Sequence, residues 1–189
     1  MDILVTGGAG FIGGHLAEQF VRDGHDVVVF DNFDPYYDVG LKEHNVEAVE
    51  DAAAGTDGSC DVVDGDIRDA DLVAELVADA DYVYHHAAQA GVRTDYAVRK
   101  YHEVNVDGTL NLLEAAEEAD LERFVFASSS SVYGEPRYLP YDEDHVTTPV
   151  SAYGASKLAA ERYTMVYAEQ RDVPAVALRY FTVYGPRMR

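Results

Sequence analysis

A tyrosine and a lysine stand four residues apart in the stretch Tyr153-Gly154-Ala155-Ser156-Lys157. On a helix this spacing places both side chains on one face. A phenol with its unperturbed pKa near 10 is a poor base at neutral pH, but a nearby ammonium favours the phenolate. The pair is therefore a candidate for removing a proton from a hydroxyl group. The alternative is an ordinary amphipathic helix, in which the tyrosine is buried and the lysine is solvated.

Four serines, Ser128 to Ser131, follow the stretch Arg123 to Ala127, which has the composition of a buried strand. In an open α/β sheet, ligands bind at the carboxyl ends of the strands. A serine hydroxyl at such an end can bond a substrate oxygen and help to pass its proton. The serines and the Tyr153/Lys157 pair therefore define a candidate catalytic site.

The turn from Thr6 to Gly13 joins an apolar run, Met1 to Val5, to a helical pattern that begins at Phe11 and ends near Gly24. Its glycines match two motifs: G-x-G-x-x-G at Gly8, Gly10 and Gly13, and G-x-x-G-x-x-G at Gly7, Gly10 and Gly13. A pyrophosphate needs a backbone that it can approach closely and the free N–H groups of a helix N-terminus. Strand, glycine turn and helix together predict a dinucleotide site.

A second strand, Asp26 to Phe30, leads to Asp31, which lies 18 residues beyond Gly13. In dinucleotide sites an acidic residue at about this distance bonds the ribose 2′-hydroxyl. Because a carboxylate there repels a 2′-phosphate, the sequence favours NAD over NADP. The positive charge of oxidised nicotinamide would then act with Lys157 to favour the phenolate of Tyr153. Otherwise Asp31 is a carboxylate that caps a loop.

The chain carries 35 acidic and 14 basic residues, which gives a net charge of −21. The acidic residues are scattered along the whole sequence and do not form a tail. This charge argues against nucleic acid or an anionic membrane as a partner. We interpret it as an adaptation to high salt, in which screening reduces self-repulsion.

The length of 189 residues and the 48% hydrophobic content suit one globular domain, residues 1–189. No apolar run has membrane-spanning length, and no basic region precedes the first strand, so we expect a cytoplasmic protein without a signal peptide. The single cysteine, Cys60, excludes an internal disulfide and a cysteine metal cluster. His85 and His86 would point to opposite faces of a strand, and no metal site is expected.

Strands and helices are expected to alternate along the chain. Further strands are expected at Asp61 to Val63, at Asp81 to His85 and from Ala175 toward Phe181. Further helices are expected at Leu41 to Ala54, after an N-cap at Asp69, at Asp95 to Ala119 and at Ser151 to Arg171. A loop rich in Pro and Tyr separates the last two, from Tyr133 to Pro149. The alternation predicts an α/β fold with a doubly wound parallel sheet of the Rossmann type.

The whole chain resembles an extended short-chain dehydrogenase/reductase of the NAD-dependent sugar-nucleotide epimerase/dehydratase group. The residues that carry the resemblance are Thr-Gly-Gly-Ala-Gly-Phe-Ile-Gly, Asp31-Asn32, Asp66-Ile67, His86-Ala87-Ala88, Asn105, the serines before Val132-Tyr133-Gly134, and Tyr153 with Lys157. The resemblance implies that Ser129, counted back from Val-Tyr-Gly, is the catalytic serine beside Tyr153 and Lys157.

The same resemblance implies which residues contact NAD. Asp31 and Asn32 would bind the adenosine ribose, Asp66 and Ile67 the adenine, and Lys157 the nicotinamide ribose. The implied cofactor set is Gly7, Gly10, Phe11, Ile12, Gly13, Asp31, Asn32, Asp66, Ile67, Ala87, Ala88, Asn105, Tyr153, Lys157 and Tyr180.

Dehydratases of this group carry Asp-Glu after the catalytic threonine, and decarboxylating relatives carry a Glu there. This chain has Ser130-Ser131 instead, so the resemblance leaves epimerisation. Three stretches are similar to UDP-glucuronate 4-epimerases, namely residues 34–38, 89–93 and 179–186. Those enzymes bind substrate at positions that are here Ser130, Ser131, Thr182 and Arg189. For Arg93 a substrate contact and a solvated arginine remain equally open.

The implied reaction is inversion at C4 of a UDP-hexose, UDP-glucuronate to UDP-galacturonate, through a transient 4-keto sugar. A UDP-glucose/UDP-galactose 4-epimerase is the alternative substrate class, and a non-catalytic NAD-binding module is the alternative of another kind. Relatives are longer and end in a substrate-binding lobe, so the chain is expected to be a fragment that largely lacks this lobe. Whether the fragment alone converts substrate is left undecided by the sequence. By family analogy, the helices expected at 95–119 and 151–171 would form a homodimer interface.

Overall fold

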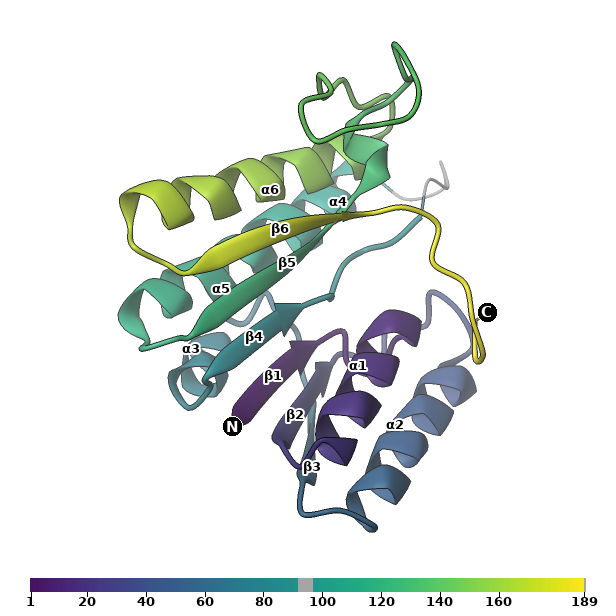
Figure 1. The fold of residues 1–189 in the computed structure, drawn as a ribbon, viewed down its shortest axis with the longest axis vertical. Coiled ribbons are helices and arrows are strands. Elements are labelled where there is room, and N and C mark those ends of the chain that lie inside the picture. Colours follow the sequence, from purple (N-terminus) through teal and green to yellow (C-terminus); the bar gives the residue numbers. More distant parts are fainter. Residues whose placement is uncertain (92–96, 189) are drawn as a thin grey trace.

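A computed structural model describes residues 1–91 and 97–188, and these residues form an α/β fold around a six-stranded parallel sheet (Figure 1). The sheet order is β3-β2-β1-β4-β5-β6. The chain therefore reverses direction across the sheet between the neighbours β1 and β4, where doubly wound folds bind their ligands. The strands are β1 (Asp2–Thr6), β2 (Asp26–Asp31), β3 (Ser59–Asp64), β4 (Tyr82–His85), β5 (Arg123–Ser129) and β6 (Ala175–Tyr180).

Helices cover both faces of the sheet, as expected for a doubly wound fold (Figure 1). One face carries α1 (Phe11–Arg22) and α2 (Val39–Ala53), which pack on each other. The other face carries α3 (Ala70–Ala78), α5 (Gly108–Glu118) and α6 (Ala152–Gln170). The helix α3 begins at the expected cap, because Asp69 accepts a hydrogen bond from the backbone N–H of Leu72. Ser151, expected as the first residue of a helix, is instead the N-cap of α6 and accepts a hydrogen bond from Gly154 N–H.

The two faces of β1 show how the sequence builds two cores. Ile3 and Val5 pack with α1 and α2, whereas Leu4 packs with Phe124 and Phe126 on the opposite face. All five side chains are at most 3% exposed. Such apolar side chains on both faces are what a buried parallel strand requires.

The prediction of one continuous helix from Asp95 to Ala119 is wrong in the middle of that range. Residues 92–96 lie outside the described part, α4 covers Val98–His102, a π-helical turn covers Glu103–Asp107, and α5 follows. The extra residue of a π turn is tolerated here because Asn105 faces inward and hydrogen-bonds the loop after β4. Val98, the first residue of α4, is 70% exposed.

The strand β5 extends two residues beyond the expected Ala127. Ser128 and Ser129 pair in register with Arg179 and Tyr180 of β6, so the first two serines belong to the sheet. Ser130 to Val132 then form a short 3-10 helix. None of the helices in the described residues is long and apolar enough to cross a membrane.

Candidate active site

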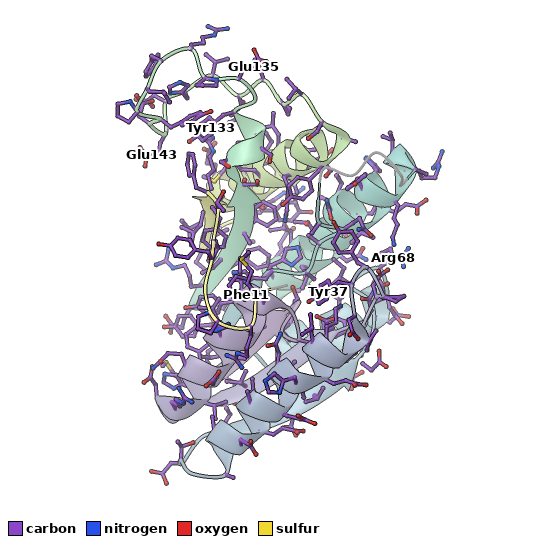
Figure 2. All side chains as sticks on the ribbon, turned by 90° about the vertical axis from the view of Figure 1, so that its right-hand side faces the viewer. Phe11, Tyr37, Arg68, Tyr133, Glu135 and Glu143 are labelled. Atoms are coloured by element: carbon purple, nitrogen blue, oxygen red, sulfur yellow. The ribbon has the colours of Figure 1, made fainter. Side chains whose placement is uncertain are left out.

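A cavity of about 480 Å³ lies at the carboxyl ends of the strands and extends from the glycine turn to α6. Figure 2 shows three of its lining residues, Phe11, Tyr37 and Arg68, on one side of the molecule. The cavity brings together most of the residues that the sequence predicts as the cofactor set: Gly7, Gly10, Phe11, Ile12, Gly13, Asp31, Asn32, Asp66, Ile67, Ala87, Ala88, Tyr153, Lys157 and Tyr180.

The glycine turn forms one end of the cavity. A Cβ atom on Gly13 would lie 2.3 Å from the carbonyl oxygen of Gly7, so the backbone here is too close for a side chain. Gly7 itself has a φ of 68°, a conformation that favours glycine. The N-cap of α1, Gly10, supplies no side-chain hydrogen bond, and the first turn of α1 contains no acidic residue. The N–H groups of this helix end therefore suit an anionic ligand such as a pyrophosphate.

Two carboxylates lie where the adenosine of a dinucleotide would be expected. Asp31, at the end of β2, accepts hydrogen bonds from the ammonium of Lys42 at 2.8 Å and the backbone N–H of Phe33 at 2.9 Å. Asp66 accepts two hydrogen bonds from the Arg68 guanidinium, one from the Arg68 backbone N–H and one from Asn32. The hydrogen bonds from Arg68 hold the pKa of Asp66 well below its usual range.

The loop after β4 forms the floor of the cavity, and Asn105 supports it from below. The amide of Asn105 accepts a hydrogen bond from Gln89 N–H at 2.7 Å and donates to Ser156 Oγ at 2.9 Å. Asn105 is 1% exposed and is not among the lining residues. Its position therefore suits support of Ala87 and Ala88 rather than direct contact with a cofactor.

His85 lies under the same loop and is fully buried. Thr109 donates its hydroxyl proton to the Asn105 carbonyl at 2.7 Å, so it accepts from His85 Nε2, 2.9 Å away. Thr6 then donates to His85 Nδ1 at 2.7 Å. Burial holds the pKa of His85 well below its usual value, so this imidazole is neutral. Its role is structural, because both ring nitrogens are used within the chain.

Ser129, Tyr153 and Lys157 meet at the other end of the cavity. The Ser129 hydroxyl lies close enough to the Tyr153 phenol to influence its pKa, and it accepts a hydrogen bond from Ser131 N–H at 3.1 Å. The ammonium of Lys157 donates to the carbonyl oxygen of Ala127 at 2.8 Å. Groups predicted from two separate segments of the sequence therefore line the same end of one cavity.

The protonation states differ from those expected from sequence. Burial raises the pKa of Tyr153, and the nearby Ser129 hydroxyl lowers it only in part. Burial also lowers the pKa of Lys157 to about 7, so near neutral pH this side chain is charged only part of the time. Lys157 alone therefore does not produce a phenolate, and additional positive charge from a ligand is needed.

The structure does not bring all of the expected substrate-binding residues together in one pocket. Ser130 and Ser131 line a second pocket beside the main cavity, together with Tyr141, Ser151 and Phe181. Thr182 is exposed just after β6 and lines neither pocket. Arg93 and Arg189 lie outside the described residues.

Several cations in the cavity have no role in the sequence interpretation. Lys42, Arg68, Lys100 and Arg187 line it with Lys157, against three acidic residues, although the whole chain is strongly acidic. Lys42, Arg68 and Lys100 are ion-paired with the three acidic residues, and Arg187 is paired with Glu18 of α1. The cavity is therefore close to neutral within a strongly acidic chain, so it repels phosphate groups less than the rest of the protein does.

A buried ion pair supports the catalytic end. Glu161, two helical turns after Tyr153, accepts hydrogen bonds from Ser128 Oγ at 2.5 Å and from the Arg179 guanidinium at 2.7 Å. Arg179 also donates to the hydroxyl of Tyr133, in the loop labelled in Figure 2. Burial acts to raise the pKa of Glu161, but the hydrogen bonds from Arg179 and Ser128 outweigh it and the pKa is lowered.

Comparison with known proteins agrees with this arrangement. Residues 3–189 match the NAD dependent epimerase/dehydratase family, and the chain belongs to this family. The UDP-glucuronate 4-epimerase 6 of Arabidopsis thaliana is 40% identical over 193 residues, which cover 98% of this chain and 40% of that protein.

Solved structures show the same fold. UDP-glucuronic acid 4-epimerase from Bacillus cereus, in complex with UDP-glucuronic acid and NAD, superposes with a TM-score of 0.90 at 40% identity and covers all of this chain. UDP-glucose 4-epimerase from Brucella ovis, in complex with NAD, has a TM-score of 0.79 at 34% identity and covers 95% of this chain. The chain spans 59% and 51% of these two proteins, so it corresponds to a part of each.

Proposed function

We propose that this chain is the NAD-binding part of an enzyme that inverts C4 of a UDP-hexose, with UDP-glucuronate and UDP-galacturonate as the substrate pair. The observation that carries the proposal is the meeting of Ser129, Tyr153 and Lys157 at one end of a cavity whose other end is the glycine turn. Such a site combines a hydroxyl-binding group, a proton acceptor and a place for a dinucleotide.

In the proposed mechanism the protein residues hold the sugar and move one proton. NAD, when bound in the cavity, would supply the acceptor for a hydride from C4 of the sugar and the donor that restores it. Tyr153 takes the proton of the C4 hydroxyl, with Ser129 bonded to the same oxygen. Lys157 would bind the nicotinamide ribose and supply part of the positive charge that favours the phenolate. Inversion would be completed at the opposite face of the 4-keto sugar, where Tyr153 returns its proton to the C4 oxygen, with no net redox change.

A glucuronate substrate is supported by hydroxyl groups near the catalytic end. Ser130 and Ser131 line the pocket next to Ser129, and a carboxylate at C6 needs such donors. We propose that Thr182 and Arg189 complete this part of the site in the longer protein. The competing substrate class, UDP-glucose and UDP-galactose, is favoured by the similarity to a UDP-glucose 4-epimerase.

The test is an assay of both substrate pairs, with the products identified by NMR, on this chain and on the longest natural protein that contains it. We expect conversion of UDP-glucuronate and loss of conversion in Tyr153→Phe. Conversion of UDP-glucose alone would defeat the proposed substrate. NAD binding with no conversion by the longer protein would favour a non-catalytic module, an alternative that the intact Tyr153/Lys157 pair argues against.

We further propose a cytoplasmic homodimer that pairs through α4, α5 and α6. Exposed apolar side chains on these helices support the interface: Val98 is 70%, Tyr163 43% and Val166 41% exposed. Sedimentation equilibrium tests this, and a monomer at every concentration would contradict it.

A further inference from the structure

The carboxylate expected to bind the adenosine ribose is paired with a buried lysine. Lys42 of α2 and Asp31 of β2 are each 7% exposed, and their Nζ and Oδ1 atoms are 2.8 Å apart. Both residues line the main cavity. A buried ammonium is costly without a partner, so Asp31 stabilises Lys42 as much as it serves a ligand.

The two oxygens of Asp31 are not equivalent. Among the described residues, the hydrogen bonds from Lys42 and from Phe33 N–H both reach Oδ1. Oδ2 can therefore accept a hydrogen bond from a ribose hydroxyl while Oδ1 stays bonded to the ammonium.

A second buried polar side chain lies beside Lys42. Asn45 lies three residues further along α2, lines the same cavity and is 2% exposed. Its Nδ2 donates to the carbonyl oxygen of Ala9 at 3.0 Å, but its Oδ1 atom is buried without a hydrogen-bond partner in the described structure. Asn45 therefore fixes α2 to the glycine turn through Ala9 and holds the wall of the cavity that carries Lys42.

We infer that Lys42 is a coenzyme-selecting residue: it holds Asp31 ready for a ribose 2′-hydroxyl, and it is a cation already in place for a 2′-phosphate. Selection of NAD over NADP then depends on one carboxylate. With Asp31 present, the pair is neutral and Oδ2 repels a phosphate. Without the negative charge of Asp31, the Lys42 ammonium is free to bind a phosphate. This inference rests on the proposed function only in that the cavity must hold a dinucleotide.

The test compares the binding of NAD and NADP by calorimetric titration of the unaltered chain and three variants. Asp31→Asn removes the charge but keeps an oxygen for Lys42 and Phe33. We expect the ratio of the NADP and NAD dissociation constants to fall at least tenfold in this variant. In Asp31→Asn/Lys42→Met the tighter NADP binding should disappear.

The matched control is Asp34→Asn. Asp34 lines the same cavity and accepts a hydrogen bond from Lys100 at 3.0 Å, so the substitution makes the same charge change beside another lysine. The ratio should stay that of the unaltered chain. An unchanged ratio in Asp31→Asn, or tighter NADP binding that persists without Lys42, would overturn the inference.

Thermal unfolding gives a second measurement if Asp31→Asn is poorly folded. NADP should raise its melting temperature more than NAD does, and this difference should vanish in the double variant. Equal effects of the two dinucleotides on Asp31→Asn would also overturn the inference. Failure of the unaltered chain to bind NAD would contradict the proposed function as well, whereas NAD binding with unaltered selectivity contradicts this inference alone.

Discussion

Lys157→Met should make the chain more stable at neutral and acidic pH. The ammonium is 3% exposed, and burial lowers the pKa of Lys157 from 10.5 to about 7. At about 1.4 kcal/mol for each factor of ten, this difference corresponds to about 5 kcal/mol of unfavourable free energy when the folded lysine must be charged. Methionine avoids that cost but loses the hydrogen bond to Ala127, worth about 1 kcal/mol. The expected gain at pH 6 is therefore about 4 kcal/mol.

The pH dependence identifies the cause. Between about pH 7 and pH 10 the unfolded lysine carries a proton that the folded lysine has lost, so the lysine makes the free energy of unfolding rise with pH. Below about pH 7 both states are protonated and the full cost is present. The advantage of Lys157→Met should therefore shrink by about 3 kcal/mol between pH 6 and pH 9.

The assay is urea unfolding of both proteins at several pH values, with Lys157→Arg as the control. An arginine stays charged throughout this range, so its difference from Lys157→Met should not shrink with pH. A Lys157→Met variant that is less stable than the parent at pH 6, or an advantage that does not change with pH, would refute the burial argument.

Three further results are expected. Arg179→Met should lower the free energy of unfolding by about 3–5 kcal/mol, because it leaves the Glu161 carboxylate buried and unpaired. In urea unfolding, Arg179→Met/Glu161→Met should recover most of this loss, and equal losses in the two variants would contradict the pairing. Gly13→Ala should weaken NAD binding at least tenfold in calorimetry, because its Cβ would meet the Gly7 carbonyl, whereas Gly55→Ala should leave NAD binding unchanged. Equal NAD binding by Gly13→Ala and the unaltered chain would exclude the glycine turn as the phosphate site. The melting temperature should rise by about 5 °C or more between about 0.1 M and 2 M KCl, because screening reduces the repulsion of a chain with net charge −21; equal or greater stability in low salt would reject adaptation to high salt.

The main features of the fold and cofactor cavity follow from local sequence patterns. The glycine turn and Asp31 have fixed spacing because a strand, a turn and a helix position them, and the structure brings them to one cavity. Tyr153 and Lys157 are one helical turn apart, so their common face also follows from sequence.

The remaining features depend on contacts between distant segments. The π turn at Glu103–Asp107 is stabilised by the hydrogen bonds of Asn105 to Gln89, and no local pattern encodes this partner. Lys42 reaches Asp31 only because α2, which packs on α1 and β3, starts near the end of β2. A single lysine in a modest helix gives no warning of this contact. The protonation of Tyr153 and Lys157 depends on their burial, which spacing alone does not reveal.

The most direct test is a crystal structure of this chain with NAD. The account predicts the pyrophosphate at the N-terminus of α1, the adenosine ribose at Asp31, and the nicotinamide ring in contact with Tyr153. A dinucleotide bound with its nicotinamide away from Tyr153, or crystals that take up no NAD at concentrations that saturate related enzymes, would contradict the central claim.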